Sequence, residues 1–411
     1  MNKQNKGKNI VKTGVTLCFY GLLSLSISAA QAAPLTSQER LGKMLFFDKN
    51  LSEPNGQSCA SCHHPKAGFA DPDTHLPVSE GVIQGLFGGR NSPTASYAKF
   101  FPEFSYTNGV AIGGQFWDGR AANLTEQAKG PFLNPVEMAN PDKETVIADV
   151  RASRYVSLFN RVCGATADTE AAYQCVAESI AAYEKTDEVS PFTSKFDAVM
   201  AGEATFTRLE RQGRMLFNGR ALCSQCHTDR GGMGMGNANN ASSSPVLFTD
   251  FKYYNLGLPK NNEYPLNLQP STIDLGLGSV LNEASENGKF KTPHLRNIAN
   301  TPPYMHNGLL KTLKEVVHFY NTRDIPGLWD APEVSQNLET RLLGNLRLSS
   351  RQEDAIVAYM MTFTDGYTPE SNEPVTPPAS KTPNTGAAPR NDVFWCTSLN
   401  KHKTHSMKII H

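Results

Sequence analysis

Two copies of a Cys-x-x-Cys-His unit constrain the fold of this chain more than any other feature of its sequence. The units are Cys59–His63 and Cys223–His227. Each follows an octet of closely similar sequence, Glu39–Phe46 before the first unit and Glu210–Phe217 before the second. The connector between octet and unit is longer in the first copy than in the second. The chain is therefore predicted to contain one module twice.

The spacing within each unit suits covalent attachment of haem. Two thiols so placed reach the two vinyl groups of one haem, and the adjacent histidine swings under the iron. Zinc half-sites are one alternative, but zinc needs four ligands and would leave both histidines as spectators. A disulfide within each unit is another, and it also leaves the histidines unexplained. The predicted attachment residues of the two c-type haems are Cys59, Cys62 and His63, and Cys223, Cys226 and His227.

The N-terminus has the pattern of a secretory signal peptide. Several lysines precede an apolar run, Val15–Ile27, and a small-residue stretch, Ala30–Ala33. The run is too short and too rich in serine for a stable membrane span, although an uncleaved anchor is the alternative. We expect cleavage after Ala32 and a mature protein in the periplasm.

The apolar pattern predicts a mostly α fold. Capping boxes, Thr36 with Glu39 and Thr207 with Glu210, begin a helix in each octet. Strand-like alternation is almost absent, so the expected class is two cytochrome c-like haem domains related by internal duplication. Further helices are expected at residues 143–155, 170–183, 313–320 and 350–363.

Domain boundaries follow from the two modules and from a change in composition near residue 366. We expect a signal peptide at 1–32, an N-terminal haem domain at 33–200 and a C-terminal haem domain at 201–365. Residues 366–411 are rich in proline, serine and threonine, and are expected to form a disordered extension. With 39 acidic and 39 basic residues, the chain has no charge excess that would indicate a nucleic-acid partner.

The remaining cysteines of the mature chain are Cys163, Cys175 and Cys396. Export would place them where disulfides persist, so Cys163 and Cys175 could pair. Buried free thiols are equally common, and the sequence leaves both readings open. Cys396 would be left over in either case.

An aromatic, an amide and a carboxylate lie close together in the segment between the two haem units. They are Trp117, Gln127 and Glu137. Acid–base groups beside an open iron position distinguish a peroxidase from an electron carrier. Each residue also has an ordinary reading: Trp117 as core filler, Gln127 and Glu137 as solvated groups, and Asp118 with Arg120 as a local ion pair.

From about Glu39 to about Phe363 the chain resembles the bacterial di-haem cytochrome c peroxidase and MauG superfamily. By this resemblance the haem at His63 is the peroxidatic one, which reacts with hydrogen peroxide, and the haem at His227 transfers electrons. The motifs that carry it are both haem units, Arg90–Thr94, Trp117–Glu137, Lys291–Asn297 and Pro303–Gly308.

The resemblance also assigns roles to single residues. It implies that Glu137 is the acid–base carboxylate above the first haem, that Gln127 positions peroxide or water, and that Trp117 carries electrons or holes between the haems. It further implies one calcium ion between the domains. The implied calcium ligands are Asn91, backbone carbonyls around Thr292 and Pro293, and water.

The chain departs from its relatives at the first haem. Family members that need reductive activation carry a distal histidine about eight residues before the position of Asn91. Here Glu80–Gly85 contains none, and His75 is expected to be a loop residue. We therefore hypothesise a first haem that is open even when both irons are ferric.

A second departure concerns the sixth ligand of the haem at His227. In relatives it is a methionine or, in MauG, a tyrosine, in or just after the segment matching Tyr304–Gly308. The register puts this position near Leu309 or Leu310, whose aliphatic side chains cannot ligate. Met305 is our prediction, as the nearest sulfur. The other candidates are Tyr304, water or hydroxide, Met233 and Met235.

Three functions compete on this reading. The leading hypothesis is reduction of hydrogen peroxide with electrons from a small cytochrome c or cupredoxin. The rival is a MauG-like enzyme that uses peroxide and a high-valent two-haem state to oxidise Trp or Tyr of a partner protein. The missing distal histidine favours this rival, whereas Ala221, where MauG has a surface tryptophan, opposes its hopping route. A plain electron-transfer cytochrome is the third. Several family peroxidases form homodimers, which is one expectation for the assembly.

Overall fold

The computed structural model describes Met1 and residues 34–229, 245–268 and 272–369. The predicted signal peptide, Met233, Met235, Cys396 and nearly all of the Pro-rich extension lie outside the described residues. The chain divides into two units, Met1–Leu35 and Thr36–His411, and the second unit contains every helix and strand of the described residues.

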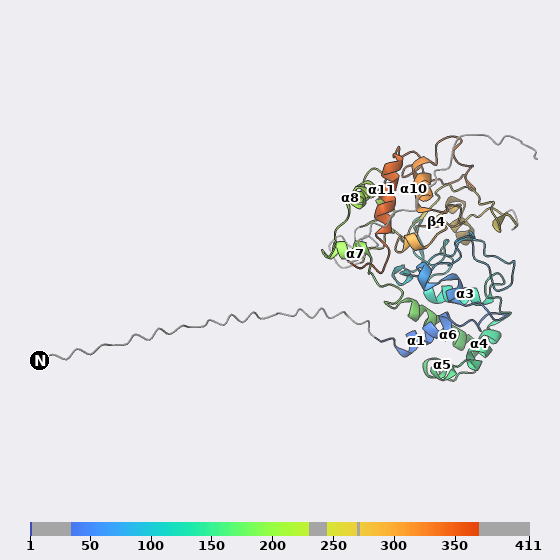
Figure 1. Ribbon diagram of the computed structural model, residues 1–411. Coiled ribbons are helices and arrows are strands. Elements are labelled where there is room, and N and C mark those ends of the chain that lie inside the picture. The colour runs from blue at the N-terminus through green and yellow to red at the C-terminus, as the bar shows by residue number, and fades with distance from the viewer. Residues whose placement is uncertain (2–33, 230–244, 269–271, 370–411) are drawn as a thin grey trace, which may run out of the picture. The chain divides into compact units, whose positions relative to one another are not determined.

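Helices dominate the described residues, as the sequence predicts (Figure 1). The strands form two antiparallel pairs only, β1 (Ser105–Thr107) with β2 (Val110–Ile112) and β3 (Tyr253–Tyr254) with β4 (Phe290–Lys291), within the described part of the chain. The helices in the first half are α1 (Ser37–Phe46), α2 (Cys59–Cys62), α3 (Leu124–Leu133), α4 (Lys143–Ala152), α5 (Val156–Cys163), α6 (Thr169–Glu184) and α7 (Lys195–Met200). Those that follow are α8 (Arg208–Asn218), α9 (Leu277–Leu281), α10 (Leu313–Thr322) and α11 (Ser350–Met361).

The first hydrophobic core is built where α1 crosses α6. The predicted capping box of Thr36 and Glu39 begins α1. A side chain at Gly42 would meet the carbonyl oxygen of Ser179 and the Cβ atom of Tyr183, so only glycine lets the two helices approach this closely.

The second hydrophobic core is built where α8 packs on α11, and Figure 1 shows these two helices side by side. The capping box at Thr207, also predicted, begins α8. Gly213 lies against the carbonyl oxygen of Ala355 and the Cβ atom of Tyr359. The two helix crossings thus share a glycine, a carbonyl and a tyrosine in the same arrangement.

The helices expected from composition and spacing are present, but two of them are shorter than expected, and α11 ends at Met361 rather than at residue 363. The helix expected at residues 143–155 ends at Ala152, because Ser153 has extended backbone angles and the chain turns before α5 begins. A disulfide joins Cys163 at the end of α5 to Cys175 in α6, which resolves the choice that the sequence leaves open. Among the described residues, no helix has the length and apolar character needed to cross a membrane.

Candidate functional site

The second Cys-x-x-Cys-His unit opens onto a large cavity. His227 is only 9% exposed, and its Nδ1 lies 2.9 Å from the carbonyl oxygen of Phe248. A carbonyl can only accept, so this contact places the proton on Nδ1 and leaves Nε2 with a free lone pair. Burial lowers the pKa of His227, which favours the neutral imidazole that a metal ligand requires.

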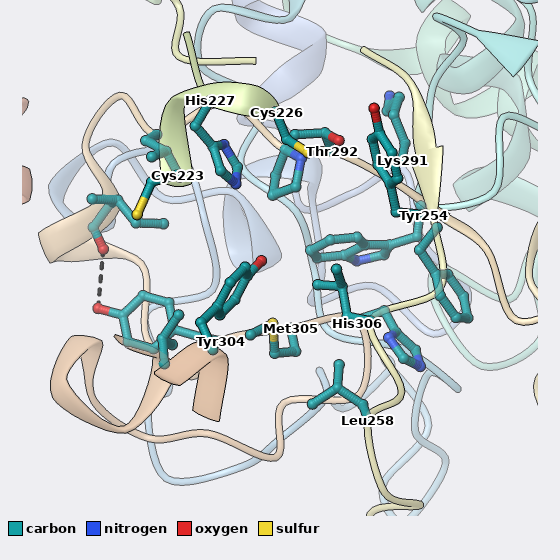
Figure 2. A pocket seen from close by; sticks show the side chains of 18 of the residues that line it. Cys223, Cys226, His227, Tyr254, Leu258, Lys291, Thr292, Tyr304, Met305 and His306 are labelled. Atoms are coloured by element: carbon teal, nitrogen blue, oxygen red, sulfur yellow. Dashed lines mark hydrogen bonds between the residues drawn. The ribbon is translucent and has the colours of Figure 1, made fainter. Parts of the chain in front are cut away.

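The cavity at His227 has the lining that a haem needs. Cys223 and Cys226 contribute free thiols to its wall, and most of the other lining side chains are apolar. Figure 2 shows the His227 ring pointing into the space, with Met305 on the opposite side. The residues present therefore fit a macrocycle bound through two thiols and one histidine.

The first unit repeats this chemistry in a different setting. α2 carries Cys59 and Cys62 as free thiols, and His63 follows at its end. The Nδ1 atom of His63 lies 3.2 Å from the carbonyl oxygen of Phe69, and burial lowers the pKa of the imidazole. This unit too has two unpaired thiols and a neutral histidine whose Nε2 is available.

Glu137 lies at the first unit, as the sequence predicts for an acid–base group. Its charge is the smallest of the influences that raise the pKa of Cys59 and Cys62, and its role as an acid–base group stays a prediction. Burial raises the pKa of Glu137 itself, and Arg120 opposes this shift. A raised pKa makes a carboxyl a better proton acceptor and donor for acid–base catalysis.

The segment Glu80–Gly85 packs directly against Glu137. The backbone N–H of Val82 donates to the carbonyl oxygen of Glu137 at 2.8 Å, and Gly81 lies against the carbonyl of Val136. This is the segment in which reductively activated relatives carry a distal histidine. His75 is exposed in a loop, as expected, and its backbone N–H donates to Asp73.

Gln127 lies on α3 and is half-buried. Its side chain makes no hydrogen bond with any residue that the structure describes, so its amide is free to bind a small molecule. It makes no hydrogen bond to Glu137 either, and its predicted role in positioning peroxide stays a prediction.

Trp117 connects segments from the two halves of the chain. Its indole N–H donates to the carbonyl oxygen of Asn91 at 2.8 Å, and its own carbonyl accepts from the N–H of Lys291 at 2.8 Å. The preceding residue, Phe116, has φ of +62°, which turns the chain sharply. Trp117 also lines the cavity that contains His227, so it is more than core filler.

An ion-pair cluster surrounds this connection. Arg120 and Asp118 pair at 3.0 Å, as the ordinary reading of the sequence suggests. Asp118 also accepts from Arg90, and Arg90 pairs with Asp274 at 2.7 Å. Asp118 and Asp274 lie far apart in sequence, so this part of the cluster could not be foreseen.

The predicted calcium ligands share the wall of one cavity, and the calcium site stays a prediction. Asn91, Thr292 and Pro293 all line the His227 cavity. The side-chain nitrogen of Asn91 donates to the carbonyl of Pro77 at 3.2 Å, which leaves its oxygen without a partner among the described residues. Amide and carbonyl oxygens are the donors that calcium prefers.

Two further side chains reach the cavity beside Met305. The hydroxyl of Tyr304 donates to the carbonyl oxygen of Ile298 at 3.0 Å and is thereby engaged. Tyr320, on α10, lines the same cavity, and its hydroxyl has no hydrogen-bond partner among the described residues. Burial, followed by the charges of Cys226 and Cys223, raises the pKa of Tyr320.

The sequence pattern alone does not single out Tyr320, although it contains a signal. The apolar spacing of residues 313–320 places it on the inner face of a helix. Such a face is expected to be core, but in the structure part of it is the wall of the cavity.

Comparisons with known proteins agree with one another. A sequence profile described as di-haem cytochrome c peroxidase matches residues 36–205. The methylamine utilization protein MauG of Paracoccus denitrificans is 39% identical over 84% of this chain and 93% of its own length. The cytochrome c551 peroxidase of Nitrosomonas europaea is 33% identical, with 83% of each chain covered.

A solved structure supports the same grouping. The diheme peroxidase BthA from Burkholderia thailandensis superposes with a TM-score of 0.71 at 31% identity. The match covers 82% of this chain and 88% of that protein.

Proposed function

Because the chain belongs to the di-haem cytochrome c peroxidase and MauG family, and is thus an oxidoreductase of that type, we propose that it reduces hydrogen peroxide to water. The overall reaction consumes two electrons and two protons for each peroxide. A small cytochrome c or cupredoxin supplies the electrons, which enter at the His227 site and reach the His63 site past Trp117.

The family implies two c-type haems, and the thiol–histidine sets of the two units fit them. When bound, each haem supplies an iron that exchanges electrons one at a time. Glu137 does the proton chemistry in this proposal. As a carboxylate it accepts the proton from one peroxide oxygen, and it returns that proton to the other oxygen as the O–O bond breaks.

The observation that supports the proposal is the position of Glu137: it is half-buried, its backbone carbonyl accepts from the N–H of Val82, and its charge acts on both thiols of the first unit. Its test is steady-state peroxide turnover with a reduced donor. Glu137→Gln keeps the shape and removes the proton acceptor, so turnover should fall by about 10²-fold or more with haem content unchanged. Glu126→Gln, on the exposed face of α3, is the matched control. Equal turnover in Glu137→Gln and wild type would reject the assignment.

Calcium binding is part of the proposal. The side-chain oxygen of Asn91, with backbone carbonyls near Thr292 and Pro293, would hold the ion beside Trp117. Its role would be to fix the two segments that Trp117 joins.

MauG-like oxidation of a partner protein is the second candidate, and one observation favours it. The unpartnered hydroxyl of Tyr320 belongs to a residue that lines the cavity at His227, and a tyrosine is the sixth ligand in MauG. We propose Tyr320 as a sixth ligand of the second haem alongside Met305, the candidate from sequence. A plain electron-transfer cytochrome is the third, and it predicts no role for Glu137.

The same proposal includes location and architecture. A signal peptide at 1–32 would direct the chain to the periplasm, and the haem domains would span 33–200 and 201–365. The matched helix crossings at Gly42 and Gly213 support an origin by duplication. A homodimer is the assembly suggested by several peroxidases.

A further inference from the structure

Glu184, the last residue of α6, is buried without a partner for one carboxyl oxygen. The side chain is 4% exposed, and its Oε2 atom makes no hydrogen bond within the described part of the chain. Burying a charged carboxylate without a partner is strongly unfavourable, because the charge loses its hydration. Unsatisfied buried groups of this kind often have a functional reason.

The matched helix crossings give Glu184 a counterpart in the second core. Tyr183 packs on Gly42 in the first core, and Tyr359 packs on Gly213 in the second. The residue that follows each tyrosine is Glu184 in α6 and Met360 in α11. Met360 lines the cavity at His227, and Glu184 occupies the matching position in the first core. One site therefore has a methionine where the other has a carboxyl group.

Electrostatics agrees with this placement. After burial, the charge of Glu184 is the largest influence that raises the pKa of Cys59, a predicted haem-attachment residue. Glu137 acts on the same thiol, more weakly. Cys59 also packs on the hydrophobic core that contains Tyr183, the residue before Glu184, so packing and charge together indicate a second carboxyl at the first site.

Few charges surround Glu184. Lys185, the next residue, lowers the pKa of Glu184 but forms no ion pair with it among the described residues. The charge of Glu184 in turn raises the pKa of Tyr183. The charged side chains of the helices packed on α6 are all exposed or half-exposed. They are Glu39, Arg40, Lys43, Glu126, Lys129, Lys143, Glu144, Asp149, Arg151 and Arg161.

We propose that Glu184 is a redox-linked proton site of the first haem. When the iron at His63 gains one electron from the donor, the carboxylate of Glu184 takes up one proton from water. When the iron loses that electron, the proton returns to water. This inference deepens the proposed function, because it requires a haem at Cys59.

The physical reason is Coulombic. Reduction removes one positive charge from the iron. In a buried, weakly screened setting, this loss makes the ionised form of Glu184 less stable relative to the protonated form. Burial raises the pKa of Glu184 to about 8. Between its oxidised-state and reduced-state pKa values, the midpoint potential of the first haem falls as pH rises. The limiting slope is about 59 mV for each tenfold change in proton concentration.

Spectroelectrochemical titration of the full-length, haem-loaded protein tests the inference between about pH 6 and about pH 9. In the wild-type protein, the midpoint potential of the first haem should fall as pH rises. Glu184→Gln, and Glu184→Met, which copies the second core, should remove the slope. Glu126→Gln, on the exposed face of α3, should retain it. A flat wild-type midpoint, or a slope that survives in Glu184→Gln, would overturn the inference.

Infrared difference spectroscopy of the wild-type protein decides the matter even if the variants do not fold. Reduction should produce the carbonyl band of a newly protonated carboxylic acid, and Glu184→Gln should lack it. A wild-type difference spectrum without such a band contradicts the inference. A haem-loaded protein that turns over peroxide at a pH-independent potential would refute this inference alone, whereas absence of haem at Cys59 would refute the proposed function as well.

Discussion

The indole nitrogen of Trp117 donates a hydrogen bond to the backbone carbonyl oxygen of Asn91 at 2.8 Å. This bond links the residue proposed to connect the two haems to the residue proposed to hold calcium. The N–H of Asn91 in turn donates to the carbonyl of His306, next to Met305. Electron transfer and calcium binding are therefore expected to depend on each other.

Replacement of Trp117 tests the connection between the sites. Trp117→Phe removes the indole N–H and its bond to Asn91 while keeping an aromatic ring. We expect at least about tenfold slower peroxide turnover, equivalent to about 1.4 kcal/mol, with both haems still attached. Trp329→Phe is the control, because its indole N–H also donates a hydrogen bond, to Thr322, but away from Asn91. Similar rates in the two variants would argue against a special role for Trp117.

Removal of calcium should affect the same step. Chelation is expected to lower turnover and to change the fluorescence of Trp117, and added calcium should restore both. Asn91→Ala should weaken calcium binding, measured by calorimetry, because it removes the one free side-chain oxygen proposed as a ligand. Full activity in protein shown by elemental analysis to be free of calcium would refute this role.

The pH dependence of peroxide reduction should report Glu137. The carboxylate form accepts the proton, so kcat/KM should rise with pH through a pKa that burial raises above the ordinary carboxyl value. Arg120 lowers this pKa, and Arg120→Gln should therefore move the rising limb to higher pH. Asp118 keeps its pair with Arg90 in that variant, which limits structural damage. A limb that moves to lower pH would contradict the assignment, and Arg40→Gln, exposed on α1, should not move it.

The sixth ligand of the second haem can be identified by paired variants. If Tyr320 binds, Tyr320→Phe should change the spin state of the ferric second haem, seen by electron paramagnetic resonance. Met305→Leu should then leave the signal unchanged. The reverse pattern would assign the position to Met305, and no change in either would indicate water or hydroxide.

The close helix crossings predict large costs for small changes. A methyl group at Gly42 would overlap the carbonyl of Ser179, so Gly42→Ala should destabilise the protein by about 3 kcal/mol in thermal unfolding. Gly213→Ala should do the same in the second core. Gly130→Ala, in α3, meets only ordinary contact with Phe116 and should be neutral or stabilising. A tolerated methyl at Gly42 would mean that the two helices pack less tightly than their geometry indicates.

The sequence is sufficient for features that depend on local patterns. The haem units, both capping boxes and the apolar helices follow from spacing alone, because each pattern involves residues close in the chain. Tyr320 and Glu184 could not be recognised in this way. Their roles depend on which helix face meets the first or second unit, and several helices separate Glu184 from Cys59 along the chain. The Arg90–Asp274 pair is of the same kind.

The crossing of α1 and α6 also sets the order of events during synthesis. The first core cannot close until α6 has left the ribosome, long after Cys59 and Cys62 have emerged. In the finished fold, burial raises the pKa of both thiols, which leaves them poorly reactive. Haem attachment to this unit is therefore expected before α6 packs over the thiols. After α6 has packed over the site, haem can no longer be attached there.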